Sequence, residues 1–258
     1  MNIDYPDVVV VVPCFNESAR FPHQYWSDAV KDLPSSRLLF VDDGSTDTTY
    51  EVLATFVSTN PRSSVLRLKK NSGKSQAIRT ALLSTIDTFP SVSLFATVDS
   101  DGSFSTADLK AMIALAKNLS NDSKMRHLVM VYPTKRRLEL KSSFNFRAFM
   151  SLFVSLILNF AWRQKTPKDL QVGMKVFVRN DIFCNLLKNT YRTRWFFEWE
   201  LVMNSIQLPT MFIKYELTSF SRIPNSRLRI RTFGRLFTEI VYLKICQLRF
   251  LNYFDTLI

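Results

Sequence analysis

Short apolar runs alternate with amphipathic stretches along the first half of the chain. The first run, residues 7–13, is rich in valine, as in a strand that is buried on both faces. The pattern predicts further strands at 37–41, 64–68, 92–98 and 127–132, separated by helices at 18–33, 46–59, 74–85 and 107–118. This alternation predicts an α/β fold with a mainly parallel sheet and helices on both faces.

The pattern changes after about residue 135. A basic stretch at 135–141 leads into the apolar segment 144–162, which is either a buried core helix or a helix lying against a membrane interface. Beyond it, the periodicity predicts strands at 173–178 and 211–215 and helices at 181–188 and 197–206. We therefore expect one α/β domain over residues 1–221 and a basic, amphipathic tail over residues 222–258.

Apolar and basic residues are interspersed through this tail. Between residues 222 and 249 it holds seven basic residues against one acid, Glu239. This composition favours an interfacial helix that binds anionic lipid, and the alternative is a docked terminal helix or an oligomer contact. No uncharged apolar run of the chain reaches the roughly 20 residues that cross a bilayer.

The whole chain carries a net charge of +12, from 34 basic and 22 acidic residues. Such an excess indicates an anionic partner, which could be nucleic acid, anionic lipid or a phosphorylated substrate. Because the sequence shows no known nucleic-acid-binding module, we do not expect a nucleic acid. The three cysteines lie far apart, which favours a reduced, cytoplasmic compartment, and the acidic N-terminal residues are unlike a signal peptide.

Polar clusters follow four of the predicted strands, at residues 13–17, 42–47, 70–74 and 99–101. The carboxyl ends of parallel strands meet at one edge of a sheet, where ligands bind. Asp99 and Asp101, one residue apart, can hold Mg²⁺ or Mn²⁺ together with a diphosphate, and the metal would offset charge on a departing nucleotide. The sequence therefore predicts a metal-assisted site at this edge.

Two other clusters have both a structural and a functional interpretation. Three carboxylates between 42 and 47 exceed what a turn and a helix cap need, so Asp42 or Asp43 can accept from a nucleobase or ribose. Ser45 or Thr46 is expected to cap the next helix. Lys74 follows Gly73 at a predicted helix start, where it is either a surface lysine or a cation that faces phosphate.

Four motifs in this order, within 12–17, 41–47, 71–74 and 98–101, resemble the inverting glycosyltransferases of family 2. These enzymes have the GT-A fold, which is built on a Rossmann-like sheet. The stretches 169–179 and 194–201 resemble the dolichyl-phosphate glucosyltransferases and dolichyl-phosphate mannose synthases. The resemblance extends over roughly residues 7–205, and it implies a nucleotide-sugar donor and a polyprenyl phosphate acceptor.

Individual positions take roles from this resemblance and from the arguments above. The expected donor-binding residues are Pro13, Asn16, Glu17, Asp42, Asp43, Gly73, Lys74 and Asp99. The expected catalytic residues are Asp101, Gln171, Glu198 and Glu200, and the expected metal ligands are Asp99 and Asp101. The acceptor phosphate is expected at Arg136, Arg137 and Arg147.

The predicted activity is transfer of a hexose from a UDP-glucose or GDP-mannose type donor to a polyprenyl phosphate. It would take place on the cytoplasmic face of an anionic membrane, where the protein could also form oligomers. A phosphate with a second pKa near about 6 is already anionic at neutral pH and needs little help from a base. The alternatives are a saccharide or protein hydroxyl acceptor, with Glu198 or Glu200 as general base, and a non-catalytic nucleotide-sugar-binding relative. The intact Asp99 and Asp101 argue against the last.

Overall fold

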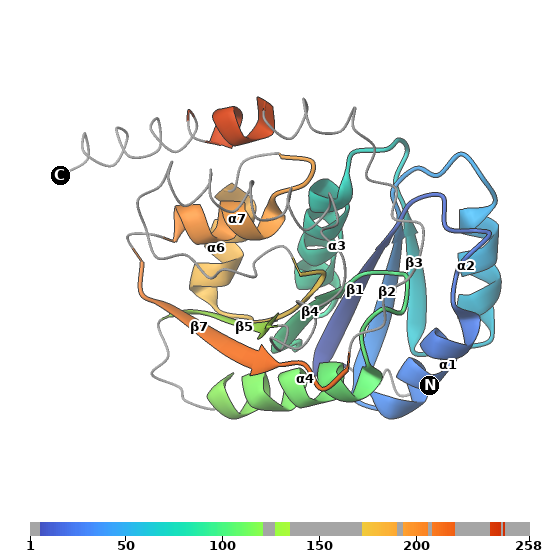
Figure 1. Cartoon of the computed structure of the whole chain (residues 1–258), viewed down its shortest axis with the longest axis horizontal. Helices are drawn as coiled ribbons and strands as arrows, with labels where there is room; N and C mark the ends of the chain where they lie inside the picture. The colour runs from blue at the N-terminus through green and yellow to red at the C-terminus, as the bar shows by residue number, and fades with distance from the viewer. Residues whose placement is uncertain are drawn as a thin grey trace, which may run out of the picture.

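The computed structural model describes residues 6–120, 127–134, 172–189, 193–205, 208–219, 238–243 and 245. Its centre is a seven-stranded sheet in the order β3-β2-β1-β4-β6-β5-β7 (Figure 1). The strands are β1 Val8–Cys14, β2 Ser36–Asp42, β3 Ser63–Arg67, β4 Leu94–Val98, β5 Leu128–Thr134, β6 Met174–Val178 and β7 Thr210–Glu216. Each lies where the hydrophobic pattern predicts a strand, within two residues at either end. The expected α/β, GT-A-type sheet is therefore confirmed.

The sheet is mixed, but mainly parallel. β1 pairs in parallel with β2 and β4, β2 with β3, and β5 with β7, whereas β6 is antiparallel to both of its neighbours. β1 is at the centre, and its valines are buried because helices cover both faces of the sheet. The carboxyl ends of β1, β2, β3 and β4 consequently lie along one edge.

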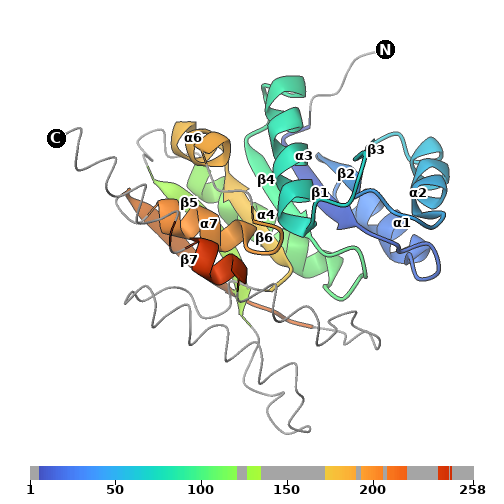
Figure 2. The same cartoon turned by 90° about the horizontal axis from the view of Figure 1, so that it is seen from above.

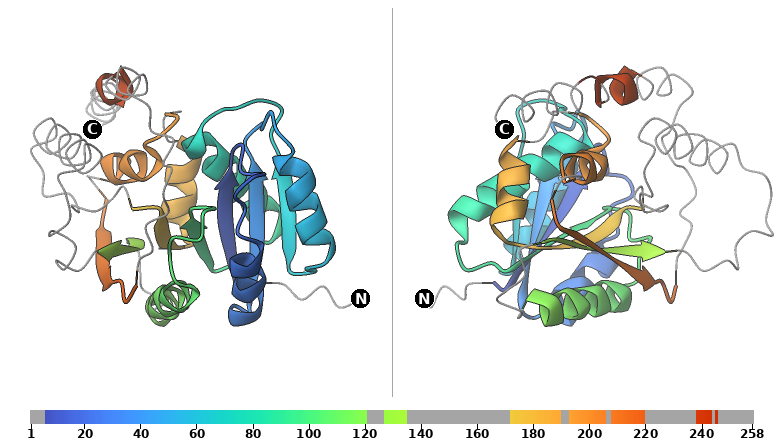
Figure 3. Two further views of the ribbon diagram at one scale, coloured as in Figure 1. Left: turned by 45° about the vertical axis from the view of Figure 1, so that its right-hand side comes forward. Right: turned by 90° about the vertical axis from the view of Figure 1, so that its left-hand side faces the viewer.

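Helices cover the sheet in two layers (Figures 1 and 3). One face packs against α1 His23–Asp32, α2 Thr49–Ser58 and α4 Thr106–Ser120. The other face packs against α3 Lys74–Thr88, α6 Asp181–Asn189 and α7 Phe197–Asn204. Alternate residues of β4 serve the two cores, since Phe95 joins the α3 side while Leu94 and Ala96 join the α1 side. The next positions on the α3 side are Thr97 and Asp99, so the strand period aims Asp99 toward α3 and α7.

Two helices begin later than the sequence pattern predicts. α1 begins at His23 rather than at Ser18, because residues 18–20 are held in turns by bonds to other loops. α2 begins at Thr49, whose backbone N–H donates to Asp47 Oδ1 at 3.1 Å, while the N-cap residue Thr48 makes no side-chain cap bond. The expectation that Ser45 or Thr46 caps this helix is therefore wrong, since both side chains bond to Asn16 instead.

A helical segment at residues 238–243 contacts the α7 layer. Ile240 and Leu243 are buried in the same core as α3, α6 and α7. Figure 2 shows this segment, in red, beside α7. The apolar segment at 144–162 lies outside the described residues. Within the part of the chain that is described, no helix has the length and hydropathy needed to cross a bilayer.

Candidate functional site

Asp43 joins the end of β2 to the loop that precedes α3. Its two carboxylate oxygens accept the backbone N–H groups of Ser72, at 2.7 Å, and Gly73, at 2.8 Å. Burial raises the pKa of Asp43, and these two hydrogen bonds oppose that shift. Gly73 has a φ of 94°, which favours glycine, and a Cβ there would lie 2.7 Å from Cβ of Arg194. Asp43 therefore sets the conformation of the loop as well as lying at the predicted site.

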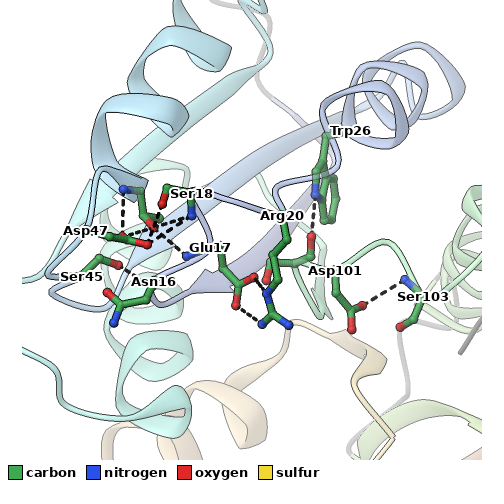
Figure 4. Close-up of polar contacts among 11 residues, drawn as sticks. Asn16, Glu17, Ser18, Arg20, Trp26, Ser45, Asp47, Asp101 and Ser103 are labelled. Carbon is green, nitrogen blue, oxygen red and sulfur yellow. Dashed lines mark hydrogen bonds and ion pairs between the residues drawn. The ribbon is translucent and has the colours of Figure 1, made fainter. Parts of the chain in front are cut away.

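The loops after β1 and β2 are joined by hydrogen bonds in both directions (Figure 4). Asn16 donates its backbone N–H to Ser45 Oγ at 2.9 Å, and its side-chain oxygen accepts the Thr46 N–H at 2.8 Å. Asp47 accepts from Ser18 Oγ at 2.7 Å and from Thr49 Oγ1 at 2.5 Å. Although partial burial opposes it, these bonds lower the pKa of Asp47. The two loops consequently form one rigid wall of the site.

Glu17 is engaged by an arginine that the sequence analysis overlooked. Both of its carboxylate oxygens pair with the guanidinium of Arg20, with Nη2 lying 2.5 Å from Oε1. Figure 4 shows the Arg20 guanidinium between Glu17 and Asp101. The hydrogen bonding of Arg20 to the Glu17 carboxylate raises the pKa of Arg20, and the charge of Asp101 adds to this. Glu17 therefore positions a cation beside the predicted metal ligand.

The Asp99-Ser100-Asp101 turn is held from three sides. The backbone N–H of Asp99 donates to the Gly173 carbonyl at 3.0 Å, continuing the ladder between β4 and β6. Trp26 Nε1 donates to the Ser100 carbonyl at 3.0 Å. Asp101 Oδ1 accepts the Ser103 N–H at 3.0 Å. These bonds place the two carboxylates at the carboxyl end of β4, as the sequence predicts.

Asp99 belongs to a cluster of four charged side chains. Lys74 pairs with Asp99, and the buried ammonium of Lys175 lies 3.2 Å from Glu198 Oε1. Burial opposes ionisation of Lys74, but the charges of Asp99 and Glu198 raise its pKa. For Lys175, which is 0% exposed, burial prevails and lowers the pKa. Lys175 was missed as a site residue because its strand pattern indicates only a buried position.

Glu200 is directed away from this cluster. It is 1% exposed, and its Oε1 accepts the Thr193 N–H at 2.7 Å. Burial raises its pKa to about 7, and the hydrogen bonds from Thr193 oppose the shift. Two positions apart on α7, Glu198 and Glu200 point to different sides of the helix. The structure thus brings Glu198, but not Glu200, to Asp99.

The remaining predicted site residues are placed as follows. Pro13 lies within β1, in register with Val41 of β2. Asp42 is fully buried, and its Oδ1 accepts the Ser45 N–H at 3.0 Å. Four predicted site residues lie outside the described part of the chain. They are Gln171 and the three arginines expected to bind the acceptor phosphate, Arg136, Arg137 and Arg147.

Asp99 and Asp101 fit a divalent cation only as part of a larger ligand set. Carboxylate oxygens are the ligands that Mg²⁺ and Mn²⁺ prefer. Among the described residues, no group of three or more His, Cys, Asp or Glu side chains is arranged to hold a metal. A cation here would need further oxygens, which a diphosphate and water can supply.

A family model and two named relatives match this chain. The profile described as "Glycosyl transferase family 2" matches residues 9–177. The chain is 25% identical, over 91% of its length and 70% of the relative's, to a dolichyl-phosphate beta-glucosyltransferase of Trichomonas vaginalis. It is also 25% identical, over 78% of its length and 62% of the relative's, to a dolichyl-phosphate beta-glucosyltransferase of Dictyostelium discoideum.

A solved structure is similar in fold. Glucosyl-3-phosphoglycerate synthase from Mycobacterium tuberculosis, in complex with Mn²⁺, UDP and glucosyl-3-phosphoglycerate, superposes with a TM-score of 0.63 at 14% identity. The alignment covers 94% of this chain and 80% of that one. At this identity the similarity establishes the fold.

The raised pKa of Glu200 makes stability depend on pH. Between its usual value of 4.5 and about 7, the folded protein keeps a proton that the unfolded chain releases. The free energy of unfolding therefore falls as pH rises through this window, by up to about 3 kcal/mol. Glu200→Gln can still accept from Thr193 and stays neutral, so it should lose less stability than the wild type between pH 5 and pH 8. Urea denaturation across this range measures the difference, with exposed Glu51→Gln as the matched control. If the free energy of unfolding changes with pH in the same way in the wild type and in Glu200→Gln, the pH dependence does not come from a raised pKa of Glu200.

The position of the Asp99 carboxylate is expected to depend on the missing side chain of Gly173. A Cβ at this position would lie 1.9 Å from Asp99 Oδ2, which is less than any real contact allows. Gly173→Ala must therefore displace the Asp99 carboxylate, and a misplacement of about 1 Å can cost on the order of 10²-fold in a reaction rate. We expect Mn²⁺-dependent nucleotide binding to weaken in calorimetry. Unchanged binding would show that the turn adapts.

Proposed function

The chain belongs to glycosyl transferase family 2, and from this premise we propose that it transfers a hexose from a nucleotide-diphosphate sugar to a polyprenyl phosphate at a membrane surface. The observation that carries the proposal is the meeting of Asp99, Asp101 and Lys74 at the carboxyl edge of the sheet. Carboxylates for a metal and a cation for phosphate are what a nucleotide diphosphate requires.

We assign the nucleotide-sugar donor to the wall formed by the loops after β1, β2 and β3. Asp42, Asp43 and Asn16 shape the pocket for the nucleoside, while Lys74 and Arg20 face its diphosphate. The structurally similar synthase has been crystallised with UDP and with UDP-glucose in the presence of Mn²⁺. This supports a UDP-glucose type donor, with a GDP-mannose type as the alternative for the same site.

A divalent metal bound by Asp99 and Asp101 would stabilise the negative charge on the departing diphosphate. The protein's own contribution is to hold the sugar between this edge and the acceptor. In an inverting displacement, an acceptor oxygen forms its bond to the anomeric carbon as the diphosphate oxygen leaves with the bonding electrons. Lys74 and Arg20 lie on the side of the leaving group, where their charges favour the developing anion.

Three observations support a phosphate acceptor. The two relatives described above are named dolichyl-phosphate beta-glucosyltransferases. The carboxylate of Glu198 is engaged by Lys175, and that of Glu200 is buried against Thr193. A general base must reach the acceptor's proton, and neither glutamate is free to do so. A phosphate acceptor needs no such base, and its expected partners are Arg136, Arg137 and Arg147, since guanidinium groups pair bidentately with phosphate.

The C-terminal segment supports a membrane partner. Ile240 and Leu243 face the core, whereas Val241 and Ile245 are 43% and 47% exposed on the outer side. Trp195, on the adjoining loop, is 41% exposed. An outward apolar stripe within a tail that is rich in basic residues suits the interface of an anionic membrane. We place the reaction at the cytoplasmic face.

The donor half of this proposal predicts metal dependence. Asp101→Asn should reduce sugar transfer by about 10²-fold or more, because it removes a carboxylate that would help to hold the divalent cation against the negative charge developing on the diphosphate. Asp28→Asn, an exposed aspartate on α1, is the matched control and should be neutral. Transfer from radiolabelled UDP-glucose or GDP-mannose, with and without chelator, measures this effect. Full activity in excess chelator would overturn the metal assignment.

The acceptor half predicts that no glutamate acts as a general base. Glu200→Gln should keep substantial transfer, whereas loss of a true general base costs about 10²–10⁴-fold. Arg136→Ala should raise the concentration of lipid phosphate that is required and leave donor binding unchanged, and Lys at that position should rescue poorly. The product should extract into organic solvent and be labile to mild acid. An acid-stable glycoside, from an enzyme that loses transfer in Glu200→Gln, would mean that the acceptor is a hydroxyl.

A further inference from the structure

The C-terminal segment contacts the site through Glu239, the acidic residue of an otherwise basic stretch. Its carboxylate accepts the backbone N–H groups of Arg194 and Trp195, each at 3.2 Å. Burial raises the pKa of Glu239, and these two bonds oppose that shift. Ile240 and Leu243, on the same segment, are buried beside α7. The segment is therefore held by apolar packing and, at one point, by a carboxylate that binds two N–H groups just before α7.

Arg194 connects this point to the loop that precedes α3. Its backbone carbonyl accepts the Ser75 N–H at 2.9 Å, and its guanidinium donates to the side-chain oxygen of Asn71. Gly73 packs directly on its backbone, since a Cβ on Gly73 would lie 2.8 Å from the Arg194 carbonyl oxygen. Arg194 thus contacts the loop at three residues, Asn71, Gly73 and Ser75, through polar bonds and close packing.

The same loop is held on its other side by Asp43. The N–H groups of Ser72 and Gly73 both donate to that carboxylate. Residues 71–75 therefore lie between Asp43, just past the end of β2, and Arg194, on the segment before α7. Lys74, which pairs with Asp99, is carried on this clamped loop. Any shift of Arg194 must move the loop or break its bonds.

We propose that Glu239 is a positioning residue for the donor site, acting through Arg194, so that docking of the C-terminal segment sets nucleotide affinity. The inference rests on the proposed function, because it takes the loop at 71–75 as part of the donor site. A carboxylate suits this role, since charge-assisted hydrogen bonds to backbone N–H groups are stronger than neutral ones. Loss of the Glu239 carboxylate leaves the N–H groups of Arg194 and Trp195 without this acceptor, at the point where Arg194 contacts the loop at 71–75.

The coupling must work in both directions. If docking of residues 238–243 favours nucleotide binding, then nucleotide binding favours docking by the same factor. A nucleotide added to the wild type should therefore slow amide hydrogen exchange in the C-terminal segment as well as in the loop at 71–75. Packing by Ile240 and Leu243 alone would stabilise the segment but would not transmit this effect.

The test compares Glu239→Gln and Glu239→Ala with Glu51→Gln, which changes an exposed glutamate on α2. Calorimetry with Mn²⁺ and UDP or GDP, without lipid, gives nucleotide affinity. Exchange measured by mass spectrometry reports on peptides that cover 71–75, 193–196 and 238–245. We expect Glu239→Ala to weaken binding by about 3- to 30-fold, Glu239→Gln to weaken it less, and Glu51→Gln to match the wild type. In the Glu239 variants, amide hydrogen exchange should become faster in all three peptides. The thermal stability of the rest of the core should stay unchanged.

The outcomes separate this inference from the proposed function. If the wild type binds neither nucleotide, the donor assignment fails. If the wild type binds and the Glu239 variants bind equally well, with unchanged exchange at 71–75, Glu239 is a packing residue and the inference is wrong. Binding that weakens in Glu51→Gln as much as in Glu239→Gln would also overturn it, because the effect would then not belong to the Glu239 carboxylate.

Discussion

The geometry of the site depends on one buried charge. Lys175 is fully buried on β6, at the level where the sheet's core meets its polar edge. Removing an ammonium from water costs several kcal/mol unless a carboxylate and other acceptors replace the water. Glu198 supplies the carboxylate, and the Val172 carbonyl accepts a further bond. Because both partners must lie beside the Lys175 ammonium, the start of α7 and the turn before β6 have little conformational freedom.

That turn is what aligns Asp99. The backbone bond from Asp99 to Gly173 extends the pairing of β4 and β6 by one step, and the missing side chain of Gly173 leaves room for the carboxylate. Lys74 then approaches Asp99 from α3. Positive and negative charges alternate from Glu198 through Lys175 and Asp99 to Lys74, so each is partly neutralised by its neighbours. A site that binds a diphosphate can in this way keep cations in place without a large net charge of its own.

The periodicity of the sequence predicted the described strands well, because buried parallel strands are marked by β-branched runs and polar strand ends. It also predicted that Asp43, Lys74, Asp99 and Asp101 would share one edge. What it could not predict were pairings between side chains far apart in the chain, such as Lys175 with Glu198. The start of α1 was misplaced for a similar reason. Local propensity favours a helix from Ser18, but contacts with Asp47 hold that residue in a turn.

Several acidic side chains at this edge serve the fold before any ligand arrives. Asp43 and Asp47 accept backbone N–H groups, Glu17 holds Arg20, and Glu239 holds the segment before α7. Loops at the end of a parallel sheet leave many N–H groups without a strand partner, and carboxylates satisfy two at a time. Loops fixed in this way present their cations in one arrangement. Because a preorganised site does not need to reorder on binding, more of the contact energy appears as affinity and as stabilisation of the leaving group.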